Sequence, residues 1–258
     1  MSDYTGPGVD SFKEHNGYVI DGVWFPRVTS IISIKAKPAL YRFYADLENY
    51  AEGERIKKLS ADEGTRVHEA AEAILTGREP VVDSDISPAI KAFEKFIEER
   101  NIQVDPEWVE RRVVNYSDRY AGTVDAVALI DGKLGVLDLK TSQGIYRDYN
   151  LQLGAYFPPL QEELRSLQTR WILRVDQGQI CKICGARRRV KGGREKVRAP
   201  YPPNGVNHKT CSHDWSEVEG IVELKEFPYW HEDYQAFLGA KKLWEWENIS
   251  RLKKIGYL

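Results

Sequence analysis

Apolar and polar positions alternate with two different periodicities over the first hundred residues. Residues 17–32 begin with the two-residue periodicity of a short hairpin around Asp21-Gly22. A turn and a helix follow, and Thr29 or Ser30 is the predicted N-cap of that helix. The spacing then becomes helical, and Ser87-Pro88 marks a further helix start. The predicted helices cover Pro38–Leu59, Ala61–Leu75 (ended by Gly77) and a segment from Ser87 with the apolar stripe Ile90, Phe93, Phe96 and Ile97.

The pattern changes after residue 105, where apolar and β-branched runs predict a sheet. Asp131-Gly132 is a two-residue hairpin turn between the second and third strands. A helix separates these strands from two more, and a Trp- and Leu-rich helix follows. The predicted strands are Trp108–Tyr116, Ala121–Ile130, Lys133–Thr141, Thr169–Val175 and Val218–Phe227, and the predicted helices are Asp148–Leu164 and Glu232–Leu252.

This order of elements favours an α/β fold in which a mixed β-sheet is flanked by helices and carries an inserted module. We predict a hairpin and helical N-terminal region (1–105), a core (106–175 and 218–258) and an insert (176–217). With 42% hydrophobic residues, the 258-residue chain can form one sizeable core with such an insert.

Charge separates the insert from the rest of the chain. The whole chain has a net charge of −2. Residues 176–217 contain nine Lys or Arg and four Asp or Glu, a balance of +5, which leaves −7 for the remainder. Such a patch suggests a DNA-binding segment facing phosphates, although a solvated loop has the same composition. The candidate DNA-binding residues are Arg187, Arg188, Arg189, Lys191, Arg194, Lys196 and Arg198.

All three cysteines also fall in the insert. Cys181 and Cys184 form a C-x-x-C-G knuckle, and Cys211 and His213 follow downstream. Three thiolates and one imidazole would hold a structural Zn²⁺, which would fold this polar segment into a small zinc-binding module. His208 is a rival fourth ligand, because a single residue between Cys211 and His213 is tight spacing. Three free thiols are the alternative.

The expected compartment follows from what the sequence lacks. Three clustered cysteines suit a reducing environment, and there is no run of about 18 apolar residues for a membrane span. Met1–Asp10 is polar, without the charged-then-apolar order of a signal peptide. We therefore expect a cytoplasmic protein of a bacterial cell or phage-infected host, with no membrane partner.

Two carboxylates and a lysine fall on the predicted hairpin of residues 121–141. Asp125 lies in G-T-V-D on one strand, and Asp138 and Lys140 lie in L-D-L-K-T on the next. Because strand side chains alternate, Asp138 and Lys140 share a face, and the tight turn can bring Asp125 beside Asp138. These acids would bind Mg²⁺ or Mn²⁺ through oxygen. Ordinary hairpin ends with a solvated lysine are the alternative, which the apolar neighbours of both acids disfavour.

Further motifs stand in order around this hairpin. They are Gly64-Thr65-Arg66-Val67-His68-Glu69 and Pro26–Ile32 upstream, and Gln152-Leu-Gly-Ala-Tyr156 downstream. With G-T-V-D and D-L-K-T, they resemble the PD-(D/E)XK nuclease superfamily, specifically its RecB-like exonuclease branch. The likeness covers roughly residues 24–175 and 218–250. It implies a restriction-endonuclease-like sheet, to which this chain adds a zinc-ribbon-like insertion.

The resemblance also implies roles for single residues. The implied ligands of Mg²⁺ or Mn²⁺ are His68, Asp125, Asp138, the backbone carbonyl of Leu139 and, less regularly, Glu110. Lys140 is the implied catalytic lysine, and Gln152 and Tyr156 share a helix face, where they hold DNA or Lys140. Outside this resemblance, His68 is an ordinary surface residue and Tyr156 a core aromatic. Some RecB-like nucleases use four cysteines for an iron–sulfur cluster, and with three clustered cysteines we expect none.

One segment of the N-terminal region leaves two interpretations open. Lys35, Lys37, Tyr41, Arg42, Phe43 and Tyr44 mix basic and aromatic side chains. Such a mixture can stack on unpaired bases, while aromatics at this spacing more often pack in a core.

The function expected from these observations is a metal-dependent DNA exonuclease. It would hydrolyse phosphodiester bonds at single-stranded DNA or DNA ends, in recombination, repair or phage DNA metabolism. A structure-selective or double-strand endo- or exonuclease on the same core is the nearest alternative. A catalytically inactive nuclease fold that binds DNA is another, which the complete set of acids and lysine disfavours.

Overall fold

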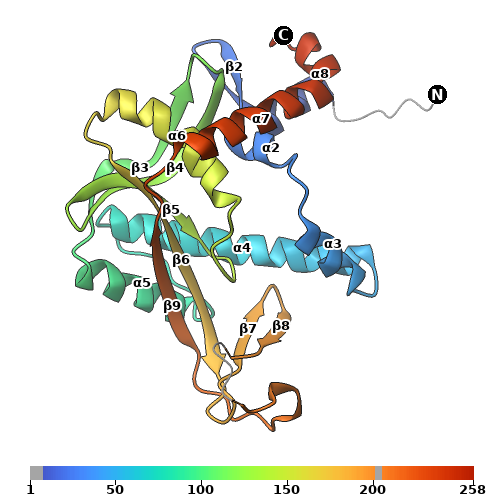
Figure 1. The fold of residues 1–258 in the computed structure, drawn as a ribbon, viewed down its shortest axis with the longest axis vertical. Coiled ribbons are helices and arrows are strands. Elements are labelled where there is room, and N and C mark those ends of the chain that lie inside the picture. Colours follow the sequence, from blue (N-terminus) through green and yellow to red (C-terminus); the bar gives the residue numbers. More distant parts are fainter. Residues whose placement is uncertain (1–7, 201–204) are drawn as a thin grey trace.

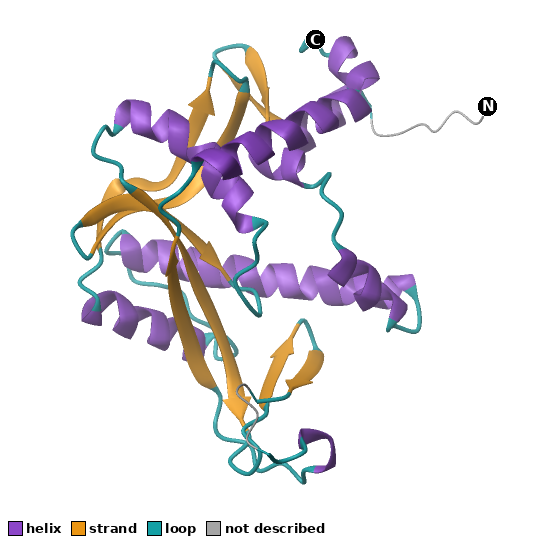
Figure 2. Cartoon of the chain, viewed as in Figure 1, coloured by secondary structure: helices purple, strands orange, loops and turns teal. Residues whose placement is uncertain are grey.

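The computed structural model describes residues 8–200 and 205–258 of the 258-residue chain. A mixed β-sheet with helices on both faces is its main feature (Figures 1 and 2). The parts of our predictions that concern residues 1–7, at the polar N-terminus, and residues 201–204, in the insert, lie outside the described residues.

Five strands form the body of the sheet, in the order β3-β4-β5-β6-β9. β5 and β6 run parallel, and the other neighbours run antiparallel. The predicted mixed α/β sheet is therefore confirmed. The strands are β3 (Gln103–Asn115), β4 (Tyr120–Ile130), β5 (Lys133–Lys140), β6 (Thr169–Ile180) and β9 (Glu219–Glu226), and a separate hairpin consists of β1 (Gly17–Ile20) and β2 (Val23–Pro26).

Helices pack on the two faces of this sheet and create two hydrophobic cores (Figure 1). On one face Leu153 and Phe237 belong to the same core as Val136 of β5, and on the other Val67 and Phe93 belong to the same core as Leu137. Burying each such side chain contributes about 1.5–3 kcal/mol. The helices are α1 (Val9–Asn16), α2 (Val28–Ile32), α6 (Tyr149–Glu163), α7 (His231–Glu247) and α8 (Ile249–Lys254) on the first side, and α4 (Tyr50–Leu75) and α5 (Ser87–Glu99) on the second, while α3 (Pro38–Ala45) precedes α4.

Several predicted helix boundaries are wrong. Neither Thr29 nor Ser30 caps α2, because the helix already begins at Val28 and both residues lie inside it. The predicted helix 38–59 is broken after Ala45, and its second half joins the following helix as α4, a single 26-residue helix capped by Asn49. The last helix is likewise broken at Asn248.

The aromatic segment of α3 is not core. None of its residues is buried, and Tyr41 remains 63% exposed. Its position beside the N-terminal half of α4, away from the sheet, explains the exposure (Figure 1). The interpretation as a core helix is therefore wrong: Tyr41 is accessible to solvent, and Phe43 and Tyr44 are half-buried.

β6 and β9 extend past the helical layers as a two-stranded arm that leads to the insert (Figure 1). The prediction ended the first of these strands at Val175, whereas β6 continues to Ile180. The insert contains a hairpin of β7 (Arg187–Lys191) and β8 (Arg194–Arg198) and a short 3₁₀ helix, η1 (His208–Thr210). Within the described part of the chain, no helix has both the length and the apolar character needed to cross a membrane.

Candidate active site

The two predicted acids face each other where β4 and β5 separate. Regular pairing of the strands ends at Ala126 and Leu137, so Asp125 and Asp138 occupy the next position on each strand. The backbone N–H of Leu139 donates a 2.6 Å hydrogen bond to Asp125 Oδ2. The Asp125 carboxylate therefore takes the place of the next backbone hydrogen-bond partner between β4 and β5, and this bond fixes the carboxylate at the strand end.

Asp138, Lys140, Gln152 and Tyr156 form one chain of contacts between β5 and α6. Lys140 Nζ lies 2.6 Å from Asp138 Oδ2 and donates to Gln152 Oε1 at 3.3 Å. Gln152 Nε2 lies 3.2 Å from the Tyr156 hydroxyl. The ring of Tyr149 packs near the ammonium group, with its centroid 5.2 Å from Nζ. The lysine is thus held in place from both sides, as the shared helix face predicts.

Burial dominates the electrostatics of this pair. Asp138 is 1% exposed, and among the described residues no hydrogen-bond donor reaches its Oδ1. Burial, opposed by Lys140 and reinforced by Asp125, raises the pKa of Asp138 to about 6. Burial lowers the pKa of Lys140, but Asp138 and Asp125 outweigh it, so the net pKa is above its usual value. Lys140 is therefore a cation at neutral pH.

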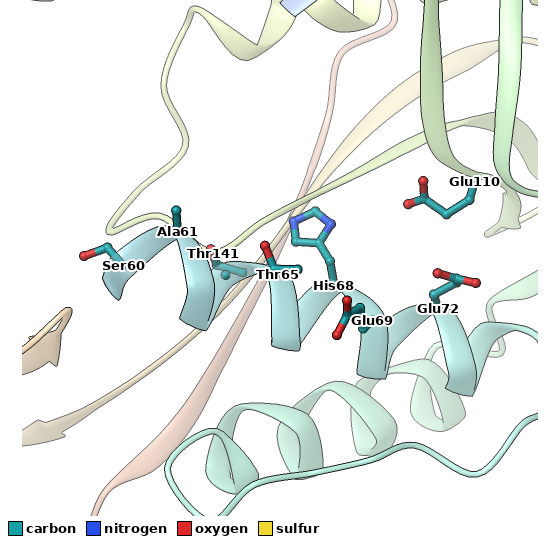
Figure 3. Close-up of a pocket in the computed structure, with 9 residues that line it drawn as sticks. Ser60, Ala61, Thr65, His68, Glu69, Glu72, Glu110 and Thr141 are labelled. Carbon is teal, nitrogen blue, oxygen red and sulfur yellow. The ribbon is translucent and has the colours of Figure 1, made fainter. Parts of the chain in front are cut away.

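His68 brings α4 into the site. Its Nδ1 lies 3.9 Å from Asp125 Oδ2, and potential ligand atoms of His68, Glu110 and Asp125 all lie within 4.8 Å of one another. Figure 3 shows His68 rising from α4, with Glu110 extending toward it from a strand. These three groups could hold a metal ion. The resemblance places Asp138 in the same ligand set, but its Oδ2 pairs with Lys140 instead. Metal binding by the backbone carbonyl of Leu139 stays a prediction.

The pKa values of His68 and Glu110 are both shifted from their usual values, although Glu110 is exposed. Burial and the neighbouring Lys140 lower the pKa of His68 to about 4, although a third of its side chain is exposed. Its imidazole is therefore neutral at pH 7 and retains a lone pair for a metal. Burial, Asp125 and Glu72 raise the pKa of Glu110 to about 7. Glu110 also has a left-handed backbone with φ of 50°, a strained conformation that is enriched at functional sites.

Two adjoining cavities with opposite linings meet at His68. A cavity of about 450 Å³ is lined by the acids Glu69, Glu72 and Glu110 (Figure 3). Another, of about 360 Å³, is lined by Lys140, Arg189 and Lys191. Both include His68 and Thr141. The site therefore has an acidic side suited to a cation and a basic side suited to a phosphate.

Close contacts explain two glycines of the sequence motifs. A Cβ on Gly122, in G-T-V-D, would collide with the Tyr156 ring and lie 3.0 Å from its hydroxyl. A Cβ on Gly64 of α4 would lie 2.9 Å from Thr141 Oγ1, next to Lys140. These glycines allow α6 and α4 to approach the strand ends that bear the acids. Thr141 and Tyr149 also line the site, and sequence reasoning missed both because neither belongs to an acid–base pattern.

The insert contains a second potential metal site. Cys181 Sγ lies 3.9 Å from Cys211 Sγ, and Cys184 Sγ lies 3.5 Å from His213 Nδ1. All four ligand atoms lie within 4.8 Å of one another, whereas His208 is not in the group. His213 reaches the position through a left-handed backbone with φ of 41°, which overcomes the tight C-x-H spacing. The structure therefore groups the predicted ligands, with His213 as the fourth.

All seven predicted DNA-binding cations lie on the β7–β8 hairpin, and several of them contact neighbouring residues. Arg189 donates to Asp176 at 2.6 Å, and both Arg189 and Lys191 donate to the carbonyl of Thr141. Arg198 donates to Gln143 at 2.7 Å, and Arg188 pairs with Glu195. The hairpin itself was not predicted, although Gly192-Gly193 between two short strands is a recognised turn signal.

Comparison with known proteins adds no name to this site. No known protein family matches the chain, and no curated protein matches it either. The functional proposal therefore rests on the sequence motifs and on the geometry of the acids, the lysine and the basic hairpin.

Proposed function

We propose that this protein is a metal-dependent deoxyribonuclease of the PD-(D/E)XK, RecB-like type, with a restriction-endonuclease-like core and a zinc-held insert. The observation that supports it best is the convergence of residues from separate elements on one site: Asp125 from β4, Asp138 and Lys140 from β5, His68 from α4, and Gln152 and Tyr156 from α6. Adjacent acidic and basic cavities suit a cation and a phosphodiester side by side. The proposed setting is the bacterial or phage-infected cytoplasm.

The donor set fits Mg²⁺ or Mn²⁺. His68, Glu110 and Asp125 offer one nitrogen and carboxylate oxygens within 4.8 Å of one another, and Asp138 has a buried oxygen without a hydrogen bond. A cation bound there would polarise the phosphate and lower the pKa of its bound water. His68, Glu110 and Asp125 would therefore hold the ion, and only Oδ1 of Asp138 could add to them, because its Oδ2 pairs with Lys140. Since Glu110 must lose its proton to bind the ion and its pKa is about 7, binding should tighten as the pH rises.

The remaining residues would position and stabilise charge. Lys140, a cation held by Asp138 and Gln152, can orient a water molecule or neutralise developing charge on the phosphate. It is too strongly protonated to act as a general base. Tyr156, through Gln152, fixes the side-chain amide that accepts from Lys140. Arg189 and Lys191 line the same cavity and would bind the flanking phosphates.

The Cys181, Cys184, Cys211 and His213 group is proposed to bind structural Zn²⁺. Distances of 3.5–3.9 Å between paired ligand atoms suit four ligands around one ion with bonds of about 2.0–2.3 Å. All four positions are filled by protein, so the ion would be structural and would fix the start of β7.

Cleavage assays with matched variants test the nuclease proposal. End-labelled single- and double-stranded DNA, linear and circular, is incubated with Mg²⁺ or Mn²⁺. Lys140→Ala should lower the rate on the order of 10²–10³-fold. Lys133→Ala, at the exposed start of the same strand, should keep the wild-type rate. Asp125→Asn should likewise lower the rate, and Asp131→Asn, in the hairpin turn, is its control and should keep the wild-type rate. Thermal melts verify that each variant is folded.

The pattern of products decides between the competing functions. Degradation of linear DNA alone, lost with Lys140→Ala and with EDTA, supports an exonuclease, and the surviving label gives its polarity. Cutting of circles by the wild type indicates an endonuclease on the same core. Binding without any Lys140-dependent cleavage rejects the enzyme in favour of an inactive DNA-binding fold.

A further inference from the structure

The end of β5 that bears Lys140 is paired with a neighbouring strand on one side only. Pairing of β5 with β4 ends at Leu137, whereas pairing with β6 continues to Lys140, which lies opposite Arg174. Thr141 is the first residue beyond both pairings, and the loop that it begins leads to α6 with Gln152. The position of the Lys140 side chain therefore depends on what holds Thr141.

The β7–β8 hairpin holds this residue through two cations. Arg189 and Lys191, two positions apart on β7, lie on the same face of the strand. Arg189 Nη2 donates a 2.8 Å hydrogen bond to the carbonyl oxygen of Thr141, and Lys191 Nζ donates one of 2.6 Å to the same oxygen. Arg198 of β8 donates to the Gln143 side chain at 2.7 Å. Because charged donors make short and strong hydrogen bonds, these contacts fix the start of the loop.

The tip of the hairpin packs directly on α4, which gives the two cations a fixed support. Gly192 is buried, with φ of 58°, and an added Cβ would collide with the carbonyl oxygen of Ile56. Its N–H points to the Glu63 carboxylate at 3.4 Å. The hairpin therefore cannot move away from Thr141 without losing its contact with α4.

Asp176 of β6 fixes the orientation of Arg189. Arg189 Nε lies 2.6 Å from Asp176 Oδ1 and 2.8 Å from Oδ2, and Arg174 Nη1 donates to Oδ2 at 3.2 Å. The side chains of Asp176 and Arg189 are only 7% and 14% exposed. Arg174 lies opposite Lys140 in the pairing of β5 with β6. The contacts therefore form a closed ring that begins at Lys140 and Thr141 and returns to β5 through β6.

Phosphate binding does not account for Asp176. A carboxylate repels phosphates, and this one neutralises part of the charge of two arginines, so it weakens the insert as a DNA-binding surface. The hairpin itself contains Glu195, which is exposed and pairs with Arg188 at 2.6 Å. In the described part of the chain, no hydrogen bond joins Glu195 or Arg188 to the loop that follows β5. Each acid thus pairs with an arginine of β7, but only Asp176 connects that arginine to Thr141.

We propose that Asp176 is a positioning residue for Lys140. By holding Arg189 on the carbonyl oxygen of Thr141, it fixes the end of β5 and keeps the ammonium group of Lys140 in its place beside Asp138. This inference rests on the proposed nuclease function, in which Lys140 is catalytic, and it gives Arg189 a task in addition to its phosphate contacts. The insert then supports the catalytic site itself and not only the binding of DNA.

Substitution of the two acids separates positioning from phosphate binding. Asp176→Asn and Glu195→Gln each remove one negative charge beside β7, so neither should weaken the binding of DNA. Fluorescence anisotropy in Ca²⁺ gives the affinity for an oligothymidylate strand and for a DNA duplex, and cleavage of the same molecules in Mg²⁺ gives kcat. Asp176→Asn should lower kcat by about 10–10²-fold, the effect of a small misplacement of a catalytic group. Glu195→Gln should keep the wild-type kcat.

Arg189→Lys is a second variant, which keeps the positive charge. An ammonium group lacks the planar fork that reaches both Asp176 and Thr141, so we expect a similar fall in kcat. The double variant Asp176→Asn/Arg189→Lys should be no slower than the slower single variant, because both substitutions break the same contact. Thermal melts establish that each variant is folded.

Amide hydrogen exchange measures the hold on the end of β5 without any cleavage. In the metal-free protein without DNA, segment 139–144 should exchange at least about fivefold faster in Asp176→Asn and in Arg189→Lys than in the wild type, because its local opening becomes easier. Glu195→Gln should exchange as the wild type does.

The results separate this inference from the nuclease proposal. A wild-type kcat in folded Asp176→Asn overturns the positioning role, as does a loss confined to DNA affinity. Unchanged exchange of segment 139–144 in the folded variants, with Lys140-dependent cleavage by the wild type, overturns the positioning role alone. Faster exchange in Asp176→Asn, with no cleavage by the wild type, supports the hold of Asp176 on β5 and rejects the nuclease proposal.

Discussion

The body of the sheet and the insert are stabilised by different means. Around β4 and β5, two hydrophobic cores cover the strands, and buried apolar side chains hold the acids at the strand ends. In the insert, the buried cluster consists of Cys181, Cys184 and Ala186. Ion pairs and a Cys/His group take the place of a core there. The proposed catalytic residues thus lie in the region with the two hydrophobic cores, and the basic β7–β8 hairpin lies in the region for which we propose a structural metal.

This difference predicts that the two regions fail separately. Damage to the insert should slow cleavage and leave the sheet folded. Damage to the contacts between α6 and β4 should lower the stability of the whole chain and disturb Lys140. Three perturbations, ordered by expected effect, sharpen this contrast.

Loss of the Cys/His metal should have the largest effect. Cys184→Ser removes one of four ligands and leaves the base of β7 without its cross-link, so we expect the insert to lose its fold. Cleavage of single strands should fall by about 10²-fold, in line with the loss of several phosphate contacts. The sheet should still melt cooperatively near the wild-type temperature. Zinc content, limited proteolysis around residues 181–215 and a thermal melt measure these effects.

Two histidine variants make this prediction sharper. His213→Ala should lose zinc as Cys184→Ser does, whereas His208→Ala should keep it, because His208 lies outside the ligand group. Ser212→Ala, between Cys211 and His213 and exposed, is the matched control. Zinc loss in His208→Ala with retention in His213→Ala contradicts the arrangement of the ligands.

The same contrast explains how much the sequence could predict. Asp125, Asp138 and Lys140 lie on one hairpin, and Gln152 and Tyr156 lie one helical turn apart. Local periodicity therefore suffices to group each set. The closeness of Glu110 to His68 depends on how α4 crosses the sheet. From the sequence, only the motif resemblance indicated that these two residues lie together. The separation of Asp138 from the His68 group, through its pairing with Lys140, is likewise a matter of side-chain geometry.

The insert was harder to predict because charge obscured its strands. The alternation of apolar residues that identifies a half-buried strand is missing from Arg187–Lys191 and Arg194–Arg198, since most of their cations line an open cavity and not a core. Only Gly192-Gly193 marked the turn. The choice of His213 over His208 depends on a left-handed backbone that residue spacing does not reveal.

A substitution in the sheet should have an intermediate effect. Gly122→Ala places a methyl group against the ring of Tyr156, and neither β4 nor buried α6 can move freely. We expect a loss of about 1–3 kcal/mol in the free energy of unfolding, the usual cost of overpacking. The displaced tyrosine should also weaken the Gln152–Lys140 contact and slow cleavage. Gly239→Ala, on α7, where φ is not positive and a Cβ meets nothing within 4 Å, is the control for adding a methyl group without that contact. An equal loss of stability and activity in both variants contradicts the role of the Tyr156 contact.

The smallest effect concerns the pH dependence of the metal-free site. Burial raises the pKa of Asp138 from 3.8 to about 6 and that of Glu110 from 4.5 to about 7. Between about pH 4 and 6.5 these two carboxyls hold protons that the unfolded chain has released, whereas His68, with its pKa lowered from 6.5 to about 4, has released a proton that the unfolded chain keeps. The two carboxyls outweigh the one imidazole, so stability falls as the pH rises through this window, by less than the carboxyl shifts alone would give. Because the His68 shift opposes the carboxyl shifts and solvent screens the exposed Glu110, we expect a net loss of only roughly 1 kcal/mol, so in EDTA the melting temperature should drop by about 2–4 °C.

Glu110→Gln should flatten the slope, whereas Glu107→Gln, on the same strand but outside the group of His68, Glu110 and Asp125, should not. Mg²⁺ should stabilise the protein more at pH 8 than at pH 6, because protons compete for its ligands. A metal effect independent of pH, or a slope unchanged by Glu110→Gln, would remove Glu110 from the proposed ligand set.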